Sequence, residues 1–281
     1  MNALTIEKPP ASTSQGHPRS IELPRVSPAI WRVFSSYVTR YLRKQFHGVR
    51  VLRTGAFPQV AGEPLAIYLN HPSWWDPLVC ICLARNYLND RTSYGPFDSE
   101  ALARYRILER IGCFGVEQGS LRGTIRFLQI GGEILRRPLT ALWITAQGEF
   151  VDPRSRPVAL RAGLGHLAAR AERGAFVPLA IEYVFWTERS PEVLLSFGEP
   201  LRAGSEALPC GDTRACSEAL AARLERTQDQ LAQAAQRRDP AEFTTVLSGR
   251  VGVNWFYDTW RRGWATLRGR AFQLEHGACE R

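Results

Sequence analysis

A histidine and an aspartate five residues apart offer the clearest chemistry in the sequence. His71 and Asp76 lie in the stretch N-H-P-S-W-W-D-P (residues 70–77). A carboxylate that fixes the tautomer of an imidazole and stabilises the imidazolium makes the histidine an effective general base. A structural role is the alternative, because Ser73 and Asp76 have the spacing of a helix capping box and Pro77 suits a first helical turn. These residues alone leave both interpretations open.

Other chemistries find less support in the sequence. It contains no G-x-S-x-G elbow, no Walker loop and no H-E-x-x-H motif. The six cysteines form no C-x-x-C pair, which favours a reducing compartment over a disulfide framework and argues against a zinc site. We therefore expect no metal site and no resident cofactor.

Strand and helix signals alternate between residues 63 and 200. The predicted strands are residues 65–69, 114–117, 141–145, 176–185 and 193–197. The predicted helices are residues 73–86, 99–112, 122–137 and 157–173, with a further helix over 213–238. This alternation predicts an α/β fold with a central, mostly parallel sheet flanked by helices.

The excess positive charge lies in two aromatic flanks. The chain of 281 residues has a net charge of +9, and residues 23–62 hold seven cations and no acidic residue. A predicted amphipathic helix from residue 29 to 46 and the segment 250–270 mix aromatic with basic side chains, a combination suited to a membrane interface. An ordinary helix that packs its aromatic side on the domain is the alternative. The expected membrane-associating residues are Trp31, Phe34, Arg40, Arg43, Lys44, Trp255, Trp260 and Trp264.

These features predict four segments. They are a disordered tail (1–28), an amphipathic membrane-associating helix and linker (29–62), the α/β core (63–200), and a helical, aromatic-basic C-terminal extension (201–281). Because the sequence has no run of 18 apolar residues and no signal peptide, we expect a peripheral or monotopic protein on the cytoplasmic face of the cell membrane. No recognised nucleic-acid motif accompanies the charge, so nucleic acid is not an expected partner.

Four blocks in order resemble the glycerolipid acyltransferase superfamily, which includes the 1-acylglycerol-3-phosphate acyltransferases. Residues 70–77 resemble its H-x-x-x-x-D block, and G-C-F-G-V-E-Q (112–118) resembles its second block. W-I-T-A-Q-G-E-F (143–150) is similar to the third block, usually F-P-E-G-T-R, and V-P-L-A-I (177–181) to the fourth, V-P-V-A-I. The resemblance covers about residues 60–185.

The resemblance implies an O-acyltransferase in which His71 removes the proton of an acceptor hydroxyl while Asp76 holds the imidazole. The donor would be the thioester of acyl-CoA or of acyl carrier protein, and the acceptor a lyso-lipid or related lipid on the membrane surface. The implied substrate-binding residues are Ser73, Glu117, Gln147, Gly148 and Glu149. Three nearby arginines, Arg122, Arg154 and Arg156, could supply a cation for the substrate or could equally be solvated loop charges.

Two positions at which the family usually has arginine hold other residues. Gln118 ends the second block, and Phe150 ends the third. An acceptor that needs less phosphate recognition than lysophosphatidic acid would suit this pattern, for example another lyso-lipid, an ornithine-type lipid, or a glycosylated or hydroxylated terpenoid. The altered third block also leaves open a second function, that of a non-catalytic membrane- or lipid-binding protein on the same fold.

Overall fold

The structure, a computed structural model, describes residues 21–60 and 62–249. The helices are α1 (Pro28–Gln45), α2 (Asp76–Tyr87), α3 (Ser99–Arg104), α4 (Leu121–Arg136), α5 (Ala162–Arg170) and α6 (Thr213–Arg237). The strands are β1 (Gly48–Leu52), β2 (Leu65–Leu69), β3 (Thr92–Asp98), β4 (Cys113–Val116), β5 (Thr140–Thr145), β6 (Ala175–Val184), β7 (Glu192–Phe197), β8 (Leu201–Arg202) and β9 (Phe243–Ser248). Short 3-10 turns add to them.

One sheet runs through the described part of the chain in the order β4-β3-β5-β2-β6-β7-β1-β9, with β8 paired to β6. Neighbours are parallel from β4 through to β6 and again between β7 and β1. They are antiparallel where β6 meets β7 and β8 and where β1 meets β9. The predicted α/β fold with a mostly parallel sheet is therefore confirmed.

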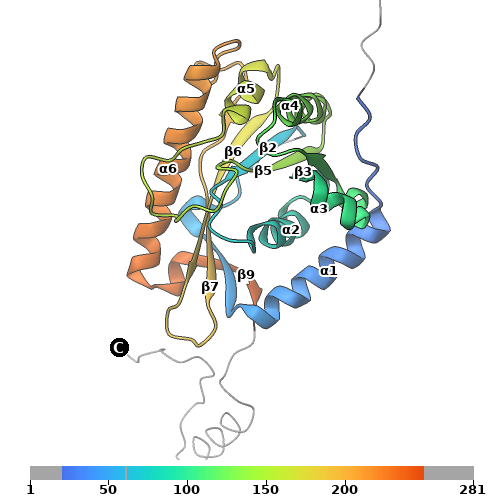
Figure 1. Cartoon of the computed structure of the whole chain (residues 1–281). Helices are drawn as coiled ribbons and strands as arrows, with labels where there is room; N and C mark the ends of the chain where they lie inside the picture. Colours follow the sequence, from blue (N-terminus) through green and yellow to red (C-terminus); the bar gives the residue numbers. More distant parts are fainter. Residues whose placement is uncertain (1–20, 61, 250–281) are drawn as a thin grey trace, which may run out of the picture.

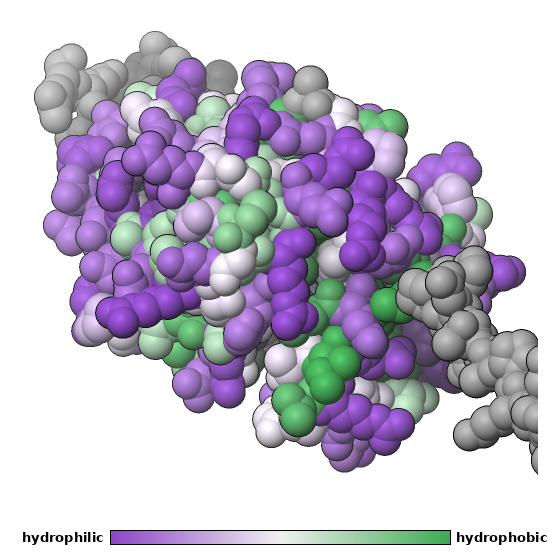
Figure 2. Space-filling view, turned by 90° about the horizontal axis from the view of Figure 1, so that it is seen from above, coloured by the Kyte–Doolittle hydropathy of each residue, from purple (hydrophilic) through white to green (hydrophobic). Residues whose placement is uncertain are grey.

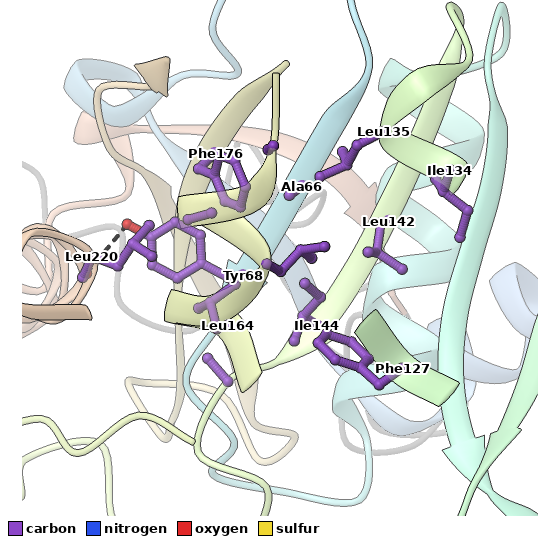
Figure 3. Close-up of a cluster of buried hydrophobic side chains, with 14 of the residues drawn as sticks. Ala66, Tyr68, Phe127, Ile134, Leu135, Leu142, Ile144, Leu164, Phe176 and Leu220 are labelled. Carbon is purple, nitrogen blue, oxygen red and sulfur yellow. Dashed lines mark hydrogen bonds between the residues drawn. The ribbon is translucent and has the colours of Figure 1, made fainter. Parts of the chain in front are cut away.

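Helices cover both faces of the sheet (Figure 1). Because side chains alternate along a strand, β2 sends Ala66 and Tyr68 towards α4, α5 and α6 and its other apolar residues towards α1 and α2. Tyr68 is fully buried, and its hydroxyl donates a 3.2 Å hydrogen bond to the carbonyl of Leu220 in α6 (Figure 3). The central strands are thus buried on both sides, as expected of a parallel sheet.

The sheet extends beyond the core predicted from the sequence. β1 lies inside the segment expected to be helix and linker, and β9 lies inside the C-terminal extension, yet the two strands pair and complete one edge. β3 was also not predicted. The helix predicted over 157–173 is shorter in the structure, where α5 spans Ala162–Arg170. The helix predicted over 99–112 is divided in the structure into α3 and a 3-10 helix.

The described end of the predicted tail is ordered against the core. Leu23 is buried, and Ile21 and Val26 pack against the same cluster. Disorder is therefore the wrong prediction for residues 21–28, of which the last begins α1. Residues 1–20 lie outside the described part of the chain.

The predicted N-terminal amphipathic helix is confirmed as α1, but its apolar side packs on the protein. Val38 and Leu42 are buried, Phe34 packs against the same cluster, and α1 lies along α2. Seen from above, the molecule presents mainly hydrophilic residues with small hydrophobic groups between them (Figure 2). None of the described helices is both long enough and apolar enough to cross a membrane.

Candidate active site

The candidate site lies where three neighbouring parallel strands end. β2 lies between β5 and β6, and the loops after β2 and β5 leave the same edge of the sheet. His71 follows the end of β2, and Gln147 follows the end of β5. β6 continues past the end of β2 and carries Tyr183 into the same region. In open α/β sheets ligands bind outside the carboxyl ends of the strands, so this is the expected position for a site.

His71 and Asp76 form a direct pair. The Nδ1 atom of His71 lies 2.6 Å from Oδ2 of Asp76. Asp76 is completely buried, whereas the His71 side chain is 15% exposed. Because a buried carboxylate accepts from Nδ1–H, the Nε2 atom is left free to accept a proton. Nε2 has no hydrogen-bond partner among the described residues. The geometry is that of a general base oriented by a carboxylate.

Both carboxylate oxygens of Asp76 are bonded. Oδ2 also accepts from the backbone N–H of Ser73 at 3.1 Å, and Oδ1 accepts from the hydroxyl of Tyr183 at 2.5 Å. The bond from Ser73 has the form of a capping interaction, although α2 begins only at Asp76. The structural and the catalytic interpretation of this carboxylate are therefore compatible: one oxygen helps to start the helix and orients the histidine.

Asn70 fixes the His71 loop to β6. Its amide accepts from the N–H of Ile181 at 2.8 Å and donates to the carbonyl of the same residue at 3.0 Å. The side chain thus imitates one more residue of strand pairing after β2 has ended. Because Asn70 is fully buried and both of its groups are satisfied, the residue before His71 has a fixed position.

The third-block loop encloses His71 from the other side. The buried side chain of Gln147 accepts from the backbone N–H of His71 at 2.9 Å, and the N–H of Val151 donates to the His71 carbonyl at 3.0 Å. The Phe150 ring lies 4.6 Å from the imidazole, centre to centre, and remains largely exposed. Gln147 therefore positions the histidine backbone, and Phe150 gives the ring an apolar neighbour.

A cavity of about 540 Å³ opens beside this loop. Its apolar wall includes Phe127 and Ile144, and its polar residues include Glu117, Gly148 and Arg161. Gly148 has φ +70°, and a Cβ there would lie 2.8 Å from Nε of Arg161, so the site needs glycine. Arg161 was not among the predicted site residues, because it lies outside the four blocks. Its Nε donates to the Gln147 carbonyl at 3.3 Å, and its Nη atoms have no partner among the described residues.

The predicted arginines lie elsewhere. Arg154 is exposed and pairs with Asp152, and its hydrogen bonds lower the pKa of that carboxyl to about 2. Arg156 pairs with Asp229 of α6 at 2.6 Å. Arg122 is exposed on α4 and does not line the cavity, and Glu149 is exposed. Of the predicted substrate-binding residues, the structure brings Ser73 and Gln147 to the dyad, and Glu117 and Gly148 to the cavity.

A second hollow of about 460 Å³ lies on the β6 side of the dyad. Pro72 and Tyr183 line it together with Arg154 and Glu182. Burial raises the pKa of Glu182 above its usual value, although the positive charge of Arg154 opposes that shift. Residues next to the dyad line both hollows, Pro72 and Tyr183 in this one and Gly148 in the other, whereas His71 and Asp76 line neither. Among the described residues no cluster of three His, Cys, Asp or Glu could hold a metal ion.

The surface of α1 differs from the prediction. Trp31 and Phe34 are only partly exposed, because their side of the helix faces the protein. Val33 and Tyr37 are the large apolar residues that α1 exposes, and Arg40, Arg43 and Lys44 are exposed as predicted. Trp74, next to the dyad, is also exposed and stacks on Trp75. Trp255, Trp260 and Trp264 lie outside the described residues.

No family model matches the sequence, and the search of curated proteins finds no match. The acyltransferase resemblance therefore stays a prediction from four blocks of residues.

Proposed function

We propose that this protein is an O-acyltransferase at a membrane surface, which moves a fatty acyl group from acyl-CoA or acyl carrier protein to a hydroxyl of a lyso-lipid or related lipid. The observation that carries the proposal is the His71–Asp76 pair: a buried, fully bonded carboxylate holds Nδ1 and leaves Nε2 free. Its place at the carboxyl ends of β2 and β5, with one hollow lined by Pro72 and Tyr183 and another by Gly148, supports a site for two substrates.

The reaction needs one base and no acyl-enzyme. Nε2 of His71 removes the proton of the acceptor hydroxyl as its oxygen attacks the thioester carbonyl. Asp76 stabilises the imidazolium that forms. The tetrahedral intermediate then collapses, the C–S bond breaks, and the leaving thiolate takes the proton from His71. The products are an ester and a free thiol, and the protein returns to its starting state.

The cavity beside Gly148 is the proposed acceptor site. Arg161 supplies a cation on its rim, and a planar guanidinium suits a phosphate or a carboxylate. Gln147 links the dyad to this cavity, because its side-chain oxygen accepts from the His71 N–H and its backbone carbonyl accepts from Arg161. Arg154 and Arg156 are engaged by carboxylates, so neither is the proposed replacement for the third-block arginine.

Contact with lipid is proposed for the outer side of α1. Val33, Tyr37, Arg40 and Lys44 recur at spacings of three and four residues, which places them on one side of the helix. Exposed apolar and aromatic residues beside cations suit an anionic bilayer surface. We propose the cytoplasmic face of the cell membrane as the location.

His71→Ala tests the proposal. With purified protein, acyl-CoA and a panel of lyso-lipids, the variant is expected to lose about 10²- to 10⁴-fold in kcat, the usual contribution of a general base. His166→Ala is the matched control, since that ring lies in α5 and contacts Thr213 instead of the dyad. Undiminished thioester consumption by the His71 variant would overturn the proposal.

A non-catalytic lipid-binding protein is the second candidate. It is favoured by the third-block loop, in which Glu149 and Phe150 are exposed and Arg154 is held by Asp152. This candidate predicts that the unaltered protein binds anionic vesicles but consumes no thioester with any acceptor in the panel. Turnover that depends on His71 would exclude it.

A further inference from the structure

Tyr183 contacts the dyad from a strand that carries none of its residues. Its hydroxyl lies 2.5 Å from Oδ1 of Asp76, the carboxylate oxygen that His71 does not use. The two residues are 107 positions apart in the chain. A phenol that donates to a buried carboxylate makes a short, charge-assisted hydrogen bond, roughly twice as strong as a neutral one.

The strand geometry determines where the Tyr183 side chain goes. Val177, Leu179 and Ile181 point towards the α1 and α2 side of the sheet, and Tyr183 continues this alternation two residues later. By then β6 has passed the end of β2, and Asn70 holds the strand to the His71 loop through Ile181. The hydroxyl therefore meets Asp76 because β6 is longer than its neighbour.

The ring of Tyr183 is held as well as its hydroxyl. It lies 5.8 Å from the ring of Phe46, centre to centre, at the end of α1. Phe46 packs in turn against Trp75, which immediately precedes Asp76. Burial and the negative charge of Asp76 raise the pKa of Tyr183 above its usual value, so the phenol stays protonated and remains a donor.

We propose that Tyr183 is a positioning residue of the His71–Asp76 pair: its hydroxyl fixes the carboxylate and takes up part of the negative charge that would otherwise act on His71. The effect of Tyr183 on the titration of His71 does not depend on the proposed function. Only the consequence for catalysis rests on it. A carboxylate with one donor fewer holds the imidazolium proton more tightly, so the free base exists only at higher pH. The hydroxyl thus keeps His71 available as a base at lower pH.

The other groups around the Tyr183–Asp76 hydrogen bond do not change charge near neutral pH, so they would not produce the same shift in the His71 titration. The Cys80 thiol of α2 faces the same carboxylate, and burial together with the charge of Asp76 raises its pKa well above the usual value. It is therefore neutral near pH 7. Phe46, just after α1, contributes an apolar ring, and the loop contributes the backbone N–H of Ser73.

Tyr183→Phe tests the inference because it removes one oxygen and keeps the ring. The titration of His71 is followed by NMR of labelled protein without substrate, and the His71→Ala spectrum assigns the signal. The midpoint is expected to rise by about half a pH unit to one unit. In the acyl-transfer assay the acid limb of kcat/KM is expected to move by the same amount.

Tyr68→Phe is the matched control. It also removes a buried hydroxyl with one hydrogen bond, but this bond reaches Leu220 on the α6 side of the sheet (Figure 3). It is expected to lower the unfolding temperature to a similar degree and to leave the His71 titration unchanged. A merely structural role for Tyr183 would give the same result in both variants.

The outcomes separate the two proposals. A His71 midpoint that is unchanged in folded Tyr183→Phe overturns the inference, whatever the activity. A shifted midpoint in a protein that transfers no acyl group supports the inference and counts against the proposed function. A shift of both the midpoint and the acid limb supports both.

Discussion

Two loops leave the sheet side by side, and they are built differently. In the His71 loop, after β2, Asn70 and Asp76 are completely buried and their side-chain polar atoms are all paired inside the protein. In the third-block loop, after β5, Gln147 is buried but the residues that follow it turn outwards. Phe150 exposes most of its ring, and Arg154 pairs with a carboxylate in solvent.

This difference in burial and bonding determines what each loop can contribute to the reaction. A buried, fully bonded carboxylate and histidine hold one geometry, which general base catalysis requires. Exposed ion pairs are worth little and restrain a loop weakly. We infer that the His71 loop sets the chemistry, whereas the third-block loop and the cavity beside it set the choice of acceptor. Substitutions confined to one loop can therefore test this division of roles.

Asp76→Asn is expected to have the largest effect on activity. The amide keeps the shape of the carboxylate but has only one acceptor oxygen, so it cannot accept from both His71 and Tyr183. We expect kcat to fall by about 10²- to 10⁴-fold, as when the general base itself is lost. Asp152→Asn, in the third-block loop, is the control and is expected to change kcat less than twofold, since surface pairs contribute little.

Retained activity in Asp76→Asn would remove the functional distinction between the two loops. If Asp76→Asn keeps most of its turnover while its folding is intact, the carboxylate serves only to start α2. The His71 loop would then not set the chemistry, and the contrast with the third-block loop would be one of burial only.

Asn70→Ala is expected to lower the stability of the protein much more than a substitution in the third-block loop does. The substitution leaves the N–H and the carbonyl of Ile181 without their partner in a buried position. Each unsatisfied buried group costs about 1–3 kcal/mol, so we expect the free energy of unfolding to fall by about 2–4 kcal/mol. Glu149→Ala, exposed in the third-block loop, is expected to stay within about 0.5 kcal/mol of the unaltered protein. Denaturant unfolding measures both, and equal losses in the two variants would contradict the comparison.

The sequence predicted the parts of this arrangement that are local in the chain. His71 and Asp76 lie within one strand–turn–helix unit, so their spacing and its context were enough to suggest that they meet. The alternation of strand and helix signals likewise predicted the mostly parallel sheet. β1 and β9 were missed because their pairing is not local: it joins positions about 195 residues apart, as in the bond from Arg50 to Thr245.

The parts that were missed depend on contacts between distant segments. The carboxylate that holds Arg156 is 73 residues away, in α6, and nothing in the local sequence indicates this partner. Tyr183 is 107 residues from Asp76. One signal could have found it: it continues the odd-numbered apolar positions of a strand longer than β2. Arg161 gave no signal, since it precedes α5 in an exposed loop and matches no block.

Arg161→Met is expected to have the smallest of the three effects and to confine it to acceptor binding. The guanidinium lies on the cavity rim over Gly148, and its Nη atoms have no partner among the described residues. Loss of one charge-assisted contact is expected to raise KM about tenfold for a lysophospholipid with a phosphate headgroup, with kcat nearly unchanged. Uncharged monoacylglycerol should show no such rise. Arg154→Met is the control, because its charge is already paired with Asp152. If Arg154→Met raises KM and Arg161→Met does not, the acceptor lies in the hollow beside β6, and the third-block cavity has another role.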